Sequence, residues 1–212
     1  MANYFSYFPR TFYKPIDGGS DFDIVTNIMA RFKLQENLKT NTALYYTYKI
    51  QEEDTPEVLA YKVYGDPEKH WMILMFNDMI DPQYDWPLTD RALNLFVNSK
   101  YSSNANTQSG QTGLMWARQN IHSYYKDITT TFEQNSNIIS LQIDSGTYAN
   151  TSLSSTTITL DGGYQVQKTV SKKTKSYYEY EYELNESKRN IKLIKKEFAN
   201  SLMKELKNTF LT

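Results

Sequence analysis

The sequence predicts an α+β fold in which helices and short strands lie between extended terminal arms. Three observations favour it. Helix-capping residues flank apolar segments between residues 55 and 100, apolar and polar side chains alternate within residues 138–170, and both termini are crowded with aromatic rings. The chain has 212 residues, which suffices for one substantial domain or two small ones.

Residues 1–20 are predicted to form an aromatic arm. Pro9 and Pro15 interrupt any regular element, and the turn sequence Asp17-Gly18-Gly19-Ser20 follows. Aromatic residues make up 15% of the whole chain although its mean hydropathy is −0.63, which indicates extensive contact surface. The rings of the arm lie either against the chain's own core or against a partner.

Residues 21–44 are predicted to form a helix and a connector. Apolar residues spaced three and four apart (Val25, Ile28, Met29, Phe32) indicate an amphipathic helix from Asp21 to about Leu38. The β-branched and aromatic segment Ala43–Ile50 then predicts a strand.

Three helices are expected next. Thr55 is a typical N-cap, Pro56 suits the first turn, and Gly65 ends the first helix. The second helix begins at Asp66-Pro67-Glu68 and ends at Asn77-Asp78, and the third, capped by Thr89-Asp90, continues to Lys100.

A polar segment rich in Ser, Asn, Gln and Gly, residues 101–113, is predicted to be a linker. Residues 114–170 are expected to form a small antiparallel β region, with a loop at 144–155 and a hairpin turn at Asp161-Gly162-Gly163.

Residues 171–212 are predicted to form an extended segment followed by a helix. Tyr178, Tyr180 and Tyr182 alternate with glutamates, which is typical of a strand or an extended arm with one aromatic and one acidic face. Apolar residues at every fourth position then predict a closing helix (Phe198, Leu202, Leu206, Phe210).

The composition argues against several classes of function. Absence of cysteine excludes disulfides and thiolate chemistry, and a net charge of −1 is unlike that of a general nucleic-acid binder. The histidines His70 and His122 have no second ligand at metal-site spacing, and Asp78, Asp81 and Asp85 read as caps and turns. The longest apolar run, Trp71–Phe76, is too short to span a bilayer, and no signal peptide is visible. We therefore expect no enzyme, no metal, no cofactor and no membrane insertion.

One segment resembles a LysM module, a β-α-α-β fold that binds N-acetylglucosamine polymers. The resemblance covers residues 45–100, with Thr89–Lys100 as an added helix where the family has its closing strand. It rests on six markers: Asp54, Thr55, Ala60, Gly65, Trp71 and Asn77. Glu53 and Pro56 depart from the family at the start of the first helix, where the sugar groove would lie.

A wider resemblance joins Tyr64–Leu88 to the aromatic arm, to Ile121–Tyr125 and to Glu183–Leu193. Together these segments resemble the LysM-containing baseplate wedge subunit of T-even-like contractile-tailed bacteriophages. The resemblance implies a non-enzymatic virion protein, made in the host cytoplasm. Its implied partners are the core-bundle proteins of the wedge, the sheath-initiating subunit and the neighbouring wedge, with no nucleic acid and no membrane.

We expect the terminal segments to contact these partners, while the module at 45–100 bridges adjacent wedges around the hub. The expected contact residues are Tyr4, Phe5, Tyr7, Phe8, Arg10, Phe12, Tyr178, Tyr180, Tyr182, Asn185 and Arg189. Two alternatives stay open: a module that binds peptidoglycan or chitin, and a tail-associated muramidase with Asp81 as its acid.

Overall fold

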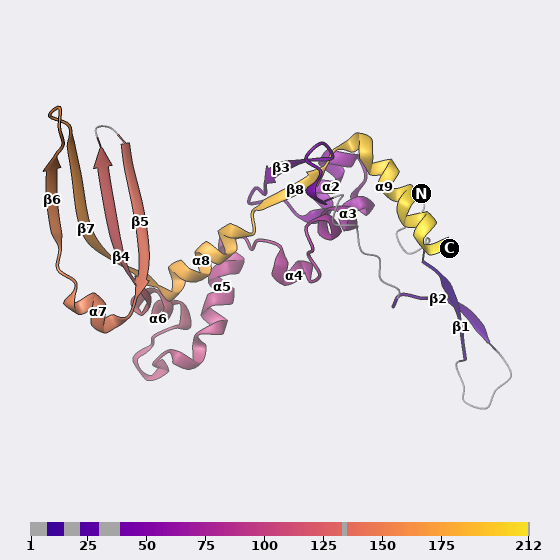
Figure 1. Cartoon of the computed structure of the whole chain (residues 1–212). Coiled ribbons are helices and arrows are strands. Elements are labelled where there is room, and N and C mark those ends of the chain that lie inside the picture. The colour runs from indigo at the N-terminus through magenta and orange to yellow at the C-terminus, as the bar shows by residue number, and fades with distance from the viewer. Residues whose placement is uncertain (1–7, 15–21, 30–38, 133–134, 212) are drawn as a thin grey trace. The chain divides into compact units, whose positions relative to one another are not determined.

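The structure is a computed structural model that describes residues 8–14, 22–29, 39–132 and 135–211 (Figure 1). It divides the chain into two units. Unit 1 comprises residues 1–89 and 186–212, and unit 2 comprises residues 90–185. The predicted mixture of helices and strands is confirmed, but the boundary near residue 100 is replaced by one at Thr89 and a second at Glu186.

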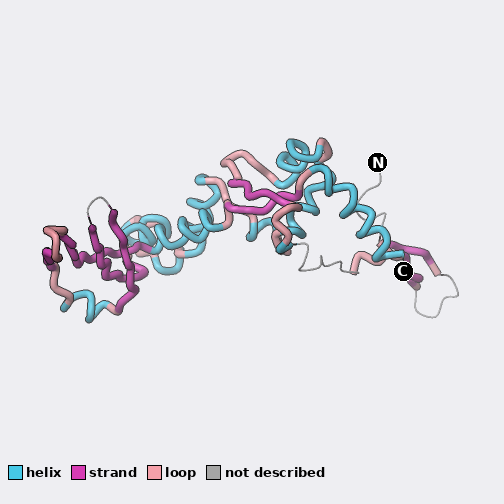
Figure 2. The backbone as a smooth tube through the Cα atoms, turned by 45° about the horizontal axis from the view of Figure 1, so that its top comes forward, coloured by secondary structure: helices cyan, strands magenta, loops and turns pink. Residues whose placement is uncertain are grey.

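Unit 1 is built on a two-stranded antiparallel sheet that carries helices. Strand β3 (Tyr45–Lys49) pairs with β8 (Asn190–Ile194), and the two lie side by side in Figure 2. Between them in sequence come α2 (Pro56–Tyr64), the 3₁₀ turn η2 (Pro67–Lys69) and α3 (His70–Phe76), followed by the short α4 (Pro82–Asp85). The last helix is α9 (Lys196–Leu211).

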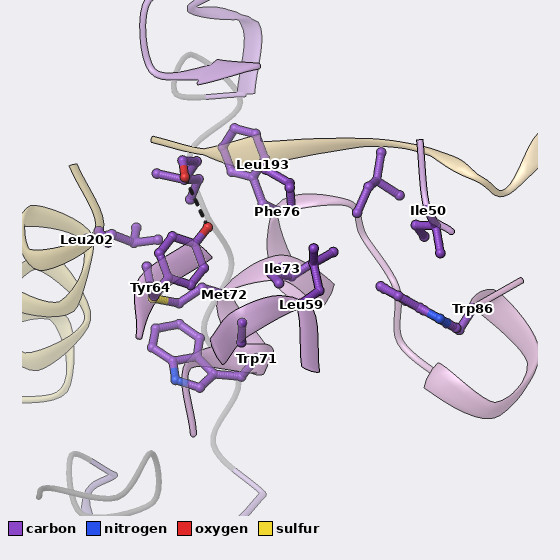
Figure 3. Close-up of a cluster of buried hydrophobic side chains, with 14 residues drawn as sticks. Ile50, Leu59, Tyr64, Trp71, Met72, Ile73, Phe76, Trp86, Leu193 and Leu202 are labelled. Carbon is purple, nitrogen blue, oxygen red and sulfur yellow. Dashed lines mark hydrogen bonds between the residues drawn. The ribbon is translucent and has the colours of Figure 1, made fainter. Parts of the chain in front are cut away.

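The core of unit 1 forms where α2 and α3 pack on the β3–β8 sheet (Figure 3). Leu59 and Met72 are buried from the helices, Leu193 from β8, and Leu202 from α9. The Tyr64 hydroxyl donates to the carbonyl oxygen of Ile194 at 3.1 Å, so the one polar group of that ring is satisfied inside the core.

The start and end signals of the first two helices are confirmed. The Thr55 side chain accepts from the Val58 amide, Pro56 lies in the first turn, and Gly65 ends α2 in the left-handed conformation. Asp66 caps η2 in the same way, through the Glu68 amide.

Two expectations for unit 1 are wrong. The predicted helix at 21–38 is a strand where the structure describes it: β2 (Asp23–Thr26) pairs antiparallel with β1 (Arg10–Tyr13), so part of the predicted arm is a hairpin strand. The second strand of the module is not replaced by Thr89–Lys100. It is β8, which arrives from the C-terminal segment.

Unit 2 begins with α5 (Asp90–Lys100), the 3₁₀ turns η3 (Ser102–Asn104) and η4 (Thr107–Ser109), and α6 (Gly113–Gln119). A four-stranded antiparallel sheet of order β5-β4-β7-β6 follows (Figure 1). Its strands are β4 (Ile121–Phe132), β5 (Asn135–Ile143), β6 (Ser154–Thr159) and β7 (Gln165–Ser176). The predicted Asp161-Gly162-Gly163 turn joins β6 and β7, with both glycines at positive φ.

Three further corrections concern unit 2. The predicted linker at 101–113 contains η3 and η4, and it ends where Gly113 meets the backbone of Asn98 and Ser102. The predicted loop at 144–155 contains helix α7 (Ser145–Asn150), capped by Asp144. The Tyr/Glu segment is not extended: it forms helix α8 (Tyr177–Ser187).

Candidate interaction surfaces

The carboxylate of Asp54 organises the loop between β3 and α2. It accepts hydrogen bonds from the Tyr48 hydroxyl at 2.7 Å, the Gln51 amide at 3.0 Å and the Lys62 ammonium at 2.6 Å. The carbonyl oxygen of the same residue accepts from the indole N–H of Trp86 at 2.9 Å. One buried residue therefore connects the sheet, the first helix and the α4 region.

These contacts shift two pKa values in opposite directions. Burial alone would raise the pKa of Asp54, but the hydrogen bonds from Lys62, Tyr48 and the Gln51 amide outweigh it and lower that pKa. The hydrogen bond to Asp54, followed by burial, raises the pKa of Tyr48 to about 12. Asp54 is thus held ionised as an acceptor and is unsuited to be a general acid near neutral pH.

Three other markers of the LysM resemblance have structural roles within unit 1, whereas Thr55 and Gly65 are exposed at the two ends of α2. Ala60 and Trp71 are buried in the core of unit 1. The side-chain amide of Asn77 donates to the carbonyl oxygen of Lys192 and accepts from its amide, both at 2.8 Å. Asn77 therefore ties the end of α3 to the edge of β8 that β3 leaves unpaired, and it acts as a structural residue.

Arg189 was expected to contact a partner, but its guanidinium is used within unit 1. It donates to Glu186, to Glu52 at 2.8 Å and to the carbonyl oxygen of Ile50 at 3.4 Å. The side chain is buried, and burial would lower its pKa, yet the two carboxylates keep that pKa above its usual value. Arg189 therefore links the start of β8 to the residues that follow β3.

The tyrosines of α8 belong mainly to an aromatic cluster inside unit 2. The ring of Tyr180 stacks on His122 at 3.9 Å, and the guanidinium of Arg118 lies 4.7 Å from the ring of Tyr178. Asn185 is buried. Of the four contact residues expected on this helix, Tyr182 alone is exposed, at 41%.

Next to that cluster, Glu181 is a buried carboxylate with two partners. It accepts from the Lys100 ammonium and from the Tyr101 hydroxyl, both at 2.7 Å. The burial of Tyr101, followed by its hydrogen bond to Glu181, raises the pKa of that hydroxyl. The pattern of alternating glutamates did not predict this buried residue, because its partners are the last residue of α5 and the residue after it, about 80 positions earlier.

The hairpin of β1 and β2 carries several exposed apolar side chains. Phe12 lies opposite Ile24 and is 75% exposed, and Ile28 and Met29 extend the apolar surface just after β2. Arg10 is also exposed, whereas Phe8 is buried. Tyr4, Phe5 and Tyr7 lie outside the described residues. The sequence analysis missed Ile28 and Met29 as surface residues because their spacing was assigned to the apolar stripe of a helix, and it did not single out Ile24.

A polar hollow of about 290 Å³ lies beside the end of α3, lined by Asn77, Asp78, Met79, Asp85, Lys188, Asn190 and Ile191. No aromatic ring of the described residues lines it. Asp85 is occupied there, because its carboxylate accepts from the amides of Ile80 and Asp81.

The histidines and acidic side chains of the described ranges are dispersed. No group of three or more His, Asp or Glu side chains is placed there to hold a metal ion. His70 contacts the Pro67 carbonyl oxygen at 3.0 Å, and His122 lies in the aromatic cluster. No helix in the described ranges is both long and apolar enough to cross a membrane.

Comparison with known proteins identifies the family. A family model described as "Base plate wedge protein 53" matches residues 4–209. The chain belongs to this family. The predicted baseplate wedge family is thereby confirmed, and membership places the chain among the structural wedge proteins of the phage tail baseplate, a part of the virion. The match does not test the LysM resemblance, which stays a prediction.

A curated relative is also similar over part of its length. The baseplate wedge protein gp53 of Enterobacteria phage T4 is 39% identical to this chain over 57 residues. That stretch is 27% of this chain and 29% of the relative, so the similarity spans less than a third of either protein.

Proposed function

We propose that this protein joins the core bundle of a baseplate wedge and clamps adjacent wedges into the six-fold ring around the hub. Its partners in this proposal are the core-bundle proteins, the sheath-initiating subunit and the neighbouring wedge. The LysM-like part of unit 1 serves as the rigid body from which contact elements project. Family membership supports the setting, and the exposed β1–β2 hairpin is the observation that carries the clamping role.

The hairpin needs a partner for physical reasons. A two-stranded hairpin is marginally stable by itself in water, and large apolar side chains on such a hairpin cost free energy when hydrated. Phe12 and Ile24 form a cross-strand pair, and both are more than half exposed. A neighbouring subunit that covers this pair would stabilise the hairpin and bind through it.

The test is the double variant Phe12→Asp with Ile24→Asp, mixed with the other wedge subunits and examined by electron microscopy for ring formation. We expect soluble protein but a loss of rings, because two carboxylates would be buried without partners in the contact. Thr11→Asp with Val25→Asp is the matched control, since that pair lies on the opposite face of the hairpin. Normal rings from the Phe12 and Ile24 variant would refute the assignment.

A peptidoglycan-binding role is the second candidate, and the polar hollow near Asn77 is the observation that favours it. A sugar site commonly uses an aromatic face, which the described lining lacks. We therefore expect no saturable retention of the full chain on insoluble peptidoglycan. Saturable retention that is lost in Asp78→Ala would favour the glycan role over the clamp.

A further inference from the structure

The four-stranded sheet of unit 2 has one apolar and one polar face. Residues opposite each other in an antiparallel ladder point to the same side, so the register defines each face. Two rungs of one face each hold three aliphatic or aromatic residues, Ile139–Ile128–Val170 and Phe132–Val166–Ile158, and one polar residue at a sheet edge, Ser154 and Asn135 respectively. We call the six aliphatic and aromatic residues the apolar face. The reverse side carries Asp127, Thr129 and Thr131 opposite Ser140, Ser171, Thr169 and Gln167, with Ile138 as the aliphatic residue opposite Thr129.

Contacts between aromatic rings show which elements lie on the side of the apolar face. Phe132 and Tyr164 contact each other with centroids 6.0 Å apart, and Tyr124 meets Tyr148 of α7 at 4.9 Å. Helix α7 therefore lies on the same side as the apolar face. It contacts the sheet near Tyr124 and Lys172, and its residues Thr147 and Asn150 border the same hollow as Val170, at the nearer of the two apolar rungs.

The apolar face is not covered within the described part of unit 2. No described residue of β5, β6 or β7 is buried, and Ile139 and Ile158 are each more than half exposed. The sheet thus lacks the buried layer that normally stabilises one. An exposed apolar surface of this extent marks a protein interface.

The charges on this side have one sign. Lys126 and Lys172 are opposite each other, and Lys168 lies between the two apolar rungs, opposite Thr130. The ladder positions on this side, among the residues described, include no Asp or Glu. Neither Lys126 nor Lys168 makes an ion pair with another described residue, whereas Lys172 donates to the carbonyl oxygen of Ala149 at 3.3 Å.

A hollow next to these lysines provides room for side chains of another molecule. It has a volume of about 520 Å³ and is bordered by Lys126, Val170 and Ser154 of the sheet and by Thr147 and Asn150 of α7. Its walls are polar apart from Val170 and hold one ammonium. A carboxylate that entered it would find a cation without losing all contact with water.

We propose that the apolar face is a docking surface for a second, different protein whose contact surface is apolar and carries carboxylates opposite Lys126 and Lys168. The inference stands on the sheet and does not depend on what the hairpin binds. The charge pattern selects this occupant over another copy of the chain. A two-fold pair of sheets would bring the lysines of both copies into one apolar contact without any carboxylate to balance them.

The size of the surface also fits a folded protein. Four strands spaced about 4.8 Å apart, with about 24 Å of strand length between Lys126 and Phe132, give a flat area of roughly 400 Å². A standard interface takes about 800 Å² from each partner, so this face supplies about half of one. The aliphatic composition is typical of sheet packing and differs from the Trp- and Tyr-rich surfaces that enter a lipid interface.

Site-specific photo-cross-linking in phage-infected cells tests the proposal with the full chain. The photoreactive residue p-benzoylphenylalanine replaces Ile139, on the apolar face, or Ile138, its neighbour on the polar face. The two positions are 51% and 62% exposed, so Ile138 is a matched control. We expect an adduct from position 139 alone, joined to another polypeptide at a segment that contains Asp or Glu when sequenced by mass spectrometry.

Charge reversal provides the second arm. Lys126→Glu with Lys168→Glu should reduce the adduct at least about tenfold, as loss of two charge pairs does at an interface. Circular dichroism of the purified variants monitors the fold. If the variant at position 139 is unfolded, the photoreactive residue is placed at position 158 instead, with position 157 as its control. An adduct with another copy of this chain, an adduct with lipid, equal adducts on both faces, no adduct, or no effect of charge reversal would overturn the proposal.

A separate measurement keeps this test independent of the proposed function. Immunoblotting of purified phage particles shows whether the chain is a virion component at all. Its absence from particles would refute the baseplate role, and the adduct in infected cells would still decide whether the sheet docks a partner.

Discussion

At the scale of single residues, the side chains that the sequence marks as notable mostly hold the chain together. Asp54 satisfies three donors, Asn77 pairs with a strand backbone, and Arg189 bridges two carboxylates. The side-chain partners of Asp54 lie within eight positions of it, whereas Asn77 and Arg189 have partners more than a hundred positions away, which the sequence did not reveal. A polar residue in a helical module is therefore weak evidence for a ligand until its own hydrogen bonds are accounted for.

Asp54→Asn should lower the free energy of unfolding by about 2 kcal/mol at pH 7, because Lys62, Tyr48 and the Gln51 amide lose the buried charged acceptor that they share. Since folding lowers the pKa of Asp54, its ionised form stabilises the fold above the unfolded pKa of about 3.8. That stabilisation is lost as the pH falls through the folded-state pKa. Urea denaturation at several pH values measures both effects.

Asp66→Asn is the matched control for this change. Asp66 is a helix cap, and Asn fulfils that role about equally well, so stability should change by only a few tenths of a kcal/mol. A wild-type loss of stability on acidification that persists unchanged in Asp54→Asn would show that this carboxylate does not contribute to the pH dependence.

At the scale of elements, the sequence predicted those whose signals are local. Thr55, Pro56 and Gly65 mark both ends of α2, and two glycines mark the β6–β7 turn. These residues stabilise their element through contacts within a few positions, so no knowledge of the tertiary structure is needed.

The elements that were predicted wrongly depend on distant contacts. The tyrosines and glutamates of α8 alternate with the period of a strand, yet a helix forms because Glu181 meets Lys100 and Tyr180 meets His122. Strand β8 had a visible signal in the buried residues Ile191 and Leu193, but its partner strand lies near residue 47. A surface such as the apolar face could not be predicted from the sequence. The residues that share it are defined by the register of the paired strands, which alternation of apolar and polar residues alone does not fix.

Gly113 at the start of α6 offers a sharp test of packing between elements. A Cβ atom there would lie 2.2 Å from the carbonyl oxygen of Asn98 and 2.8 Å from the amide nitrogen of Ser102. Backbone atoms cannot yield as a side chain does, so Gly113→Ala should destabilise unit 2 by about 3 kcal/mol. Chemical denaturation followed by hydrogen exchange of the amides in α6 and β4 reports on this unit, because tryptophan fluorescence would also come from Trp71 and Trp86 of unit 1.

Gly110→Ala serves as the comparison. A Cβ atom at that position meets nothing within 4 Å, but its φ of 73° is unfavourable for alanine, so a cost of about 1 kcal/mol is expected. Equal losses in the two variants would contradict the close approach of α6 to the end of α5.

At the scale of the whole molecule, the chain is a discontinuous unit interrupted by a continuous one. Unit 1 contains a hydrophobic core and the exposed hairpin. Unit 2 contains the four-stranded sheet with its apolar face. Each unit has a surface that the described chain leaves open to other proteins, which agrees with the family's place in an assembly.

Leu193→Ala tests whether the units are separate. Leu193 is fully buried in the core of unit 1, and its truncation should cost about 3 kcal/mol. Hydrogen exchange should show weaker protection of β3 and α2, while amides in β4 and β7 stay unchanged. Leu95→Ala, at a 64% exposed position, should leave both units within about 0.5 kcal/mol. Loss of protection throughout the sheet of unit 2 would show that the two units unfold together.

The pairing of β3 with β8 also determines when unit 1 can complete its fold during synthesis. The hydroxyl of Tyr64 donates to the carbonyl oxygen of Ile194, which is translated 130 positions later. Strand β3 likewise has no ladder partner until β8 is translated. Residues 90–185 emerge from the ribosome earlier and contain all of their own sheet contacts. Unit 2 is therefore ready first, and a ribosome that stops before β8 releases a chain whose N-terminal module cannot close.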